Sequence, residues 1–233
     1  MTSFIVHTAP MTNSQPTTAP PPTASPLSEN DPRTLFALAV QQGSELIAQV
    51  HPNQLTLPTP CTDMDVRELL AHLVMVLDRV DAAGQGRDSS TWPGPDIDRF
   101  DDEWTQAWHD AAHRLQTTWT NDDVMAMSMT TPWGATMSGA ELLTLYTNEV
   151  VVHSWDLASA TGQTPEWDER AVDAAWRGIT AQLPDADRRP MWDATKAAMP
   201  PGIPWADPFA NAVAIAADAP SIDRLVAWNG RTP

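Results

Sequence analysis

The sequence predicts an all-α protein built around a four-helix bundle. Four segments repeat apolar side chains at the three- and four-residue spacing of an amphipathic helix, at about residues 31–50, 65–83, 98–119 and 139–161. The connections after the second and third segments are long, and the helical patterns that follow Gly162 are shorter. Because amphipathic helices bury their apolar stripes against one another, we expect a bundle followed by a small, mostly helical C-terminal appendage.

The ends of the four segments carry residues that favour helix termini. Asp31 precedes Pro32 at the start of the first segment, which stops before Pro52. Gly162 is a preferred stop for the fourth. Two segments begin at pairs with the spacing of a capping box, Asp65 with Glu68 and Ser138 with Glu141.

Each long segment has one apolar face that should point into the bundle. The faces expected to be buried are Val66, Leu69, Leu70, Leu73, Leu77 and Val80 in the second segment, Phe100, Trp104, Ala107, Ala111 and Leu115 in the third, and Leu142, Leu145, Tyr146, Val150 and Leu157 in the fourth.

Three regions are expected along the 233 residues. Residues 1–29 are rich in Pro, Thr and Ser without hydrophobic periodicity, which predicts a disordered tail in which Met1 and Met11 are both candidate starts. Residues 30–162 form the bundle, and residues 163–233 form an appendage packed on it. In the appendage we expect helices at about 169–183, 191–199 and 221–228 and a short strand at 213–215.

Composition excludes several classes of partner. A formal charge of −17 repels phosphate backbones, so nucleic acid is not an expected partner. No apolar run approaches the length of a membrane span, and the opening residues lack the basic start of a signal peptide, so we expect a cytoplasmic protein that does not bind membranes. Cys61 is the only cysteine and cannot form an internal disulfide. The sequence does not indicate an oligomeric state.

Glu149 and His153 are the most informative residues for function. They lie one helical turn apart, near the centre of the apolar stripe of the fourth segment. A carboxylate and an imidazole in a core cost several kcal/mol unless they are compensated, and a divalent metal compensates both. A simple ion pair between Glu149 and His153 is the alternative.

A metal needs a further ligand from a facing helix, and His72 on the flank of the second segment's stripe is the candidate. Asp156 follows His153 on the same face, where it can orient the imidazole as a hydrogen-bond acceptor, lie at the core edge, or contribute to an open coordination site. His109 and His113 also have metal-ligand spacing, but they lie opposite the apolar face of the third segment, so we expect them in solvent.

Three further residues have simpler explanations. His51 ends a helix, where a cation is favourable, and His7 lies in the tail. Cys61 precedes a helix N-terminus, which can lower a thiol pKa, but we expect a small buried residue rather than a reactive thiol.

Three separated segments resemble a known family. TPCTDMDVRELLAHLV, PWGATMSGAELLTLYTNEVVVHSWDLASATGQ and the closing APSIDRLVAWNGRTP are similar to the metal-binding domain of mycothiol-dependent maleylpyruvate isomerases, in the DinB-like superfamily of four-helix bundles, and to a compact actinobacterial subgroup. The resemblance implies a divalent metal, usually zinc, held by His72, Glu149 and His153. Met64 stands where relatives commonly carry tryptophan, and the tail after Gly162 is shorter than the C-terminal domain of the isomerases. The isomerase reaction itself is therefore not carried over.

Two nitrogens and one carboxylate leave a zinc with an open position, as in catalytic sites. We therefore expect a mycothiol-dependent transferase or isomerase of small electrophilic substrates, in which the metal lowers the pKa of the thiol. No catalytic base and no residue that binds the thiol can be named from the sequence. A non-enzymatic metal- or ligand-binding module and a metal-dependent hydrolase are the alternatives.

Overall fold

The computed structural model describes residues 27–198, 207 and 209–233, and the chain folds as the predicted all-α bundle. Nearly all of the tail predicted for residues 1–29 lies outside the described residues. No helix of the described residues is long and apolar enough to cross a membrane.

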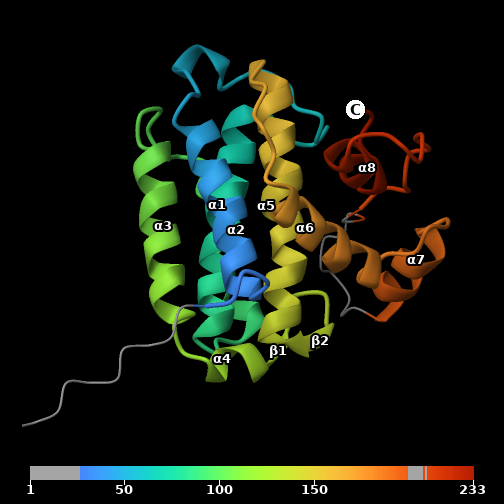
Figure 1. The fold of residues 1–233 in the computed structure, drawn as a ribbon. Coiled ribbons are helices and arrows are strands. Elements are labelled where there is room, and N and C mark those ends of the chain that lie inside the picture. Colours follow the sequence, from blue (N-terminus) through green and yellow to red (C-terminus); the bar gives the residue numbers. More distant parts are fainter. Residues whose placement is uncertain (1–26, 199–206, 208) are drawn as a thin grey trace, which may run out of the picture.

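Four long helices run side by side (Figure 1). They are α1 (Pro32–Ile47), α2 (Val66–Gly84), α3 (Trp104–Thr118) and α5 (Gly139–Thr161). The predicted caps are present, because Asp31 accepts a hydrogen bond from the Arg33 backbone N–H, and both capping boxes form at Asp65 and Ser138. Gly162 closes α5 with a φ of 74°, a left-handed conformation that favours glycine.

The apolar faces meet in one core. Leu69, Leu73 and Leu77 of α2 and Leu142, Val150 and Leu157 of α5 are all inaccessible to solvent. α5 packs against α1, α2 and α6 (Glu169–Gln182), so most of its residues are buried. Polar side chains on α5 therefore need partners inside the protein.

The third helix begins later than the sequence predicts. Phe100 was expected on its buried face, but α3 starts at Trp104 and Phe100 is 72% exposed. The loop before α3 is tied to α2, because Arg67 of α2 donates a hydrogen bond to the carbonyl of Arg99 and pairs with Asp101. The other predicted members of that face are buried, namely Trp104, Ala107, Ala111 and Leu115.

Several short elements were not predicted. Between α3 and α5 the chain forms α4 (Asp123–Ala126) and an antiparallel hairpin of β1 (Ser128–Thr130) and β2 (Thr136–Ser138), in which Met129 faces Met137. Two single-turn 3-10 helices, Pro52–Gln54 and Ser89–Thr91, occupy the loops on either side of α2.

The appendage contains α6, α7 (Arg189–Ala198) and α8 (Ser221–Trp228), close to the predicted helices (Figure 1). α6 and α8 both contact α5. The predicted strand at 213–215 is wrong: these residues form no ladder, and the Val213 N–H instead donates to the carbonyl of Ala227 at the end of α8. A capped helix end satisfies that backbone group without a partner strand.

Candidate metal centre

The predicted ligands lie in the wall of a large pocket between the bundle and the appendage. The pocket has a volume of about 490 Å³ and is lined by residues of α2, α5, α6, α7, the hairpin loop and the C-terminal segment. Most of its wall is apolar, with Met75 and Val76 of α2, Ile179 of α6 and Trp192 of α7. A pocket of this size and character is typical of a small-molecule site.

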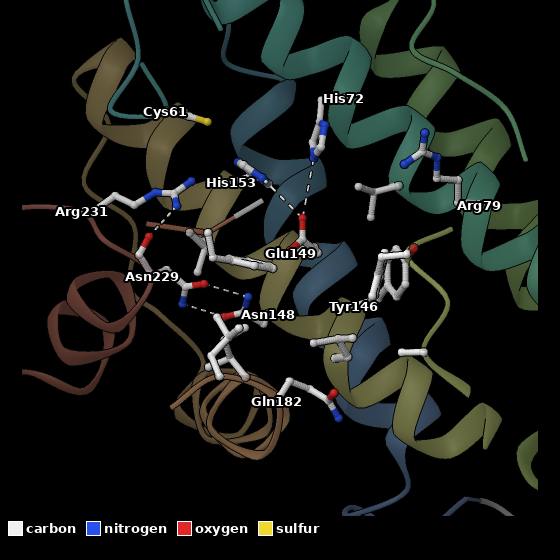
Figure 2. A pocket seen from close by; sticks show the side chains of 18 of the residues that line it. Cys61, His72, Arg79, Tyr146, Asn148, Glu149, His153, Gln182, Asn229 and Arg231 are labelled. Carbon is white, nitrogen blue, oxygen red and sulfur yellow. Dashed lines mark hydrogen bonds and ion pairs between the residues drawn. The ribbon is translucent and has the colours of Figure 1, made fainter. Parts of the chain in front are cut away.

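His72, Glu149 and His153 come together as the sequence predicts (Figure 2). The Oε2 atom of Glu149 lies 3.7 Å from Nε2 of His72 and 3.6 Å from Nε2 of His153. Ligand atoms about 2.1 Å from a tetrahedral zinc are roughly 3.4 Å apart, so these separations fit a shared divalent ion with small adjustments.

The donor atoms themselves support this fit. Nε2 of His72 is buried and has no hydrogen-bond partner in the described part of the chain, which is costly unless another group satisfies it. Both histidines direct Nε2 towards the same carboxylate oxygen, and their rings meet edge to face with centroids 4.5 Å apart. Two imidazoles and one carboxylate are a common ligand set for zinc with an open coordination position.

The pKa values of the three groups differ because their partners differ. Burial lowers the pKa of His72, and the charge of His153 lowers it further. Burial also acts to lower the pKa of His153, but its hydrogen bond to Asp156 and the nearby Glu149 raise it on balance. Burial acts to raise the pKa of Glu149, but the adjacent His153 and His72 hold it well below its usual range. Without metal, these contacts favour an ionised Glu149 beside a protonated, cationic His153.

Asp156 takes the first of the three roles considered for it. Its Oδ2 lies 3.0 Å from Nδ1 of His153, which fixes that nitrogen as the proton-bearing one and leaves Nε2 facing Glu149. Asp156 is fully buried, and Arg231 meets it with two hydrogen bonds, Nε to Oδ1 at 3.2 Å and Nη2 to Oδ2 at 2.8 Å. A segment at the end of the chain thus holds the orientation of a residue in the middle of α5.

A buried amide pair makes a second link between α5 and the C-terminal segment. The side chains of Asn148 and Asn229 exchange two hydrogen bonds, at 3.0 and 2.9 Å, and both residues are 1% exposed (Figure 2). Sequence reasoning named neither asparagine nor Arg231. The only signal was their place in two of the segments that carry the family resemblance.

The competing residues lie as follows. His109 and His113 are exposed on α3, on the side away from the core, as expected. Cys61 lies in the pocket wall, and its Sγ, His153 and Asp156 form a second group with ligand atoms within 4.8 Å. Burial raises the pKa of the Cys61 thiol, with the charge of Arg231 acting in the opposite direction. A raised pKa is the opposite of what an activated thiol requires.

Comparison with known proteins agrees with this fold. A family model described as "Mycothiol maleylpyruvate isomerase N-terminal domain" matches residues 36–158. Two proteins of Mycobacterium tuberculosis, "Uncharacterized protein MT0763" and "Uncharacterized protein Rv0738", are each 28% identical over 204 residues, 87% of this chain and 98% of theirs.

Two solved structures are also similar. A crystal structure of the mycothiol-dependent maleylpyruvate isomerase superposes with a TM-score of 0.51 at 18% identity, covering 64% of this chain and 68% of that one. A structure of a mutant of that enzyme gives a TM-score of 0.52 at 17% identity, with the same coverage. Identities this low show a shared fold alone. Membership of the family rests on the family model that matches residues 36–158.

Proposed function

The chain belongs to the mycothiol maleylpyruvate isomerase N-terminal domain family, and we propose that it is a metal-dependent enzyme that uses a low-molecular-weight thiol to act on small electrophiles. The proposed thiol is mycothiol, the metal is zinc, and the reaction is a transfer or an isomerisation in the cytoplasm. The observation that carries the proposal is the convergence of His72, Glu149 and His153 in the wall of the pocket.

His72, Glu149 and His153 would hold the metal. When bound, it supplies a Lewis acid that lowers the pKa of a thiol, so that thiolate is available near neutral pH. Asp156 keeps His153 in the tautomer that presents Nε2, and Arg231 holds Asp156 in place. The apolar walls exclude water, which strengthens electrostatic interactions in the pocket.

Metal analysis is the direct test of the ligand set. Protein dialysed without chelator should contain close to one divalent metal per chain, and His72→Ala and His153→Ala should each abolish tight binding. The double variant His109→Ala/His113→Ala is the matched control, because it removes two histidines of similar spacing from an exposed helix face. Absence of metal together with no uptake of added zinc, nickel or manganese would refute the site.

A kinetic test separates the proposed enzyme from the alternatives. The zinc form with mycothiol should consume an electrophile such as maleylpyruvate or a chlorinated aromatic faster than mycothiol does alone. Thiol-independent hydrolysis would instead indicate a hydrolase. Metal binding without any turnover across a panel of thiols and electrophiles would indicate a binding module.

A further inference from the structure

Arg79 is a cation in the pocket wall that has no partner of opposite charge among the residues that the structure describes. It lies on α2, seven residues after His72, so both project from the same face of the helix about 10 Å apart along its axis. Its Nε donates to the carbonyl of Pro93 at 2.9 Å, which fixes the plane of the guanidinium. Within the described residues Arg79 makes no ion pair, although the chain carries a formal charge of −17.

Arg231, the second arginine in the pocket wall, does have an ion-pair partner. Arg231 is neutralised by Asp156 through two hydrogen bonds. Figure 2 shows Arg231 and Cys61 on one side of the His72–Glu149–His153 cluster and Arg79 on the other. The pocket therefore has one compensated and one uncompensated arginine, on opposite sides of the candidate metal centre.

Tyr146 lines the same pocket and lies, like Arg79, on the side of the cluster away from Arg231 (Figure 2). It is one turn before Glu149 on α5, is 4% exposed, and its hydroxyl forms no hydrogen bond with any residue that the structure describes. Burial raises the pKa of Tyr146, as does Glu149, while the charge of Arg79 acts to lower it, so the hydroxyl remains a protonated donor. The remaining guanidinium N–H groups of Arg79 and the O–H of Tyr146 are therefore donors that no acceptor of the described residues satisfies.

We propose that Arg79 and Tyr146 form a carboxylate-binding subsite, which selects electrophilic substrates that carry a carboxylate on an apolar body. This inference rests on the proposed function and adds the residues that recognise the carboxylate of the substrate. Guanidinium groups bind carboxylates with paired, charge-assisted hydrogen bonds, and a phenol can add a third. The apolar wall around Met75, Val76 and Trp133 fits the body of such a substrate, and the carboxylate would direct its reactive carbon towards the metal centre.

The test compares an anionic and a neutral ligand of the same shape. Benzoate and benzamide are titrated into the purified protein, with and without bound zinc, and affinities are measured by NMR chemical-shift changes. The wild type should bind benzoate at least tenfold more tightly than benzamide in both forms. Arg79→Gln should weaken benzoate roughly tenfold or more and benzamide by less than about twofold, because only the carboxylate loses a charged partner.

Two further variants complete the design. Tyr146→Phe should weaken benzoate by roughly threefold to tenfold, and it keeps the test valid if Arg79→Gln folds poorly. Arg114→Gln is the charge-matched control. Arg114 lies on the exposed side of α3, pairs with Asp78 of α2 and does not line the pocket. It should change neither affinity.

Three results would overturn the subsite: equal affinity of the wild type for both ligands, equal loss of both ligands in Arg79→Gln, or the same loss of benzoate in Arg114→Gln. Failure of the metal centre is distinguishable, because the metal-free titration reports on Arg79 and Tyr146 without the metal. Selective benzoate binding in a protein that never takes up metal would support the subsite while refuting the proposed enzyme.

Discussion

Replacing Arg231 with methionine should strongly destabilise the metal-free protein. The change removes both hydrogen bonds to Asp156, which is fully buried and stays ionised, because its pKa is depressed by His153 and Arg231 even though burial acts to raise it. Removing one partner of a buried ion pair costs about 3–5 kcal/mol. His153 remains at 3.0 Å and still compensates part of the charge, so we expect a loss near the lower end, about 3 kcal/mol.

Urea unfolding followed by circular dichroism measures this loss. If the free energy of unfolding falls by about 2–3 kcal/mol per molar urea, a loss of about 3 kcal/mol lowers the midpoint urea concentration by roughly 1–1.5 M. The pH dependence has a definite sign. Since the folded-state pKa of Asp156 is lowered, its contribution is present above the pKa of the unfolded chain, about 3.9, and is lost as the pH falls below it. The difference between wild type and variant should therefore shrink in acid.

A matched control is available in α6. Arg170 meets Asp168 with the same geometry, Nε to Oδ1 at 3.2 Å and Nη2 to Oδ2 at 2.8 Å, but its side chain is 53% exposed. Because solvent screens exposed pairs, Arg170→Met should leave the midpoint within experimental error. If Arg231→Met were no more destabilising than Arg170→Met, burial would not be what makes the Asp156 pair important, and the reasoning would be wrong.

Three other predictions follow from the same structure. Metal affinity, measured by competition with a chelating dye, should fall about tenfold per unit as the pH drops below the raised pKa of His153, because a proton must leave that residue; affinity independent of pH would contradict this. Cys61 should react slowly with iodoacetamide at pH 7 and faster well above its ordinary pKa, and rapid neutral reaction would indicate an activated thiolate. Gly178→Ala should cost about 1–3 kcal/mol in urea melts, since its Cβ would lie 2.4 Å from the Thr144 carbonyl oxygen, whereas Gly94→Ala, with open space around it, should cost little.

The bundle and the convergence of the three candidate ligands were predictable because both depend on helical periodicity. The faces of α2 and α5 follow from residue spacing alone, and the same spacing places His72, Glu149 and His153 towards the interior. The start of α3 was not predictable in this way. It depends on Arg67 holding the backbone at Arg99, a contact between residues 32 positions apart.

The rest of the pocket depends on contacts that periodicity does not report. An arginine at a helix flank, such as Arg79, has the same pattern as a solvated residue, and only the Pro93 carbonyl and the appendage over the pocket place it in a wall. Asn229 and Arg231 follow the last helix, where helical periodicity no longer assigns a face to a residue. Their function becomes visible only when Asn148 and Asp156 are seen opposite them.

The position of these partners explains why α5 can carry so many polar groups in a buried helix. Asn148, Glu149, His153 and Asp156 recur at intervals of one, four and three residues, so they form a polar stripe on the side of α5 that faces α2 and the C-terminal segment. Each would be costly in an apolar core. Asn229 satisfies the first, Arg231 the last, and the pocket lies over the two between them. The C-terminal segment thus compensates the ends of the stripe and leaves its centre, Glu149 and His153, facing the pocket, where we propose that a metal binds.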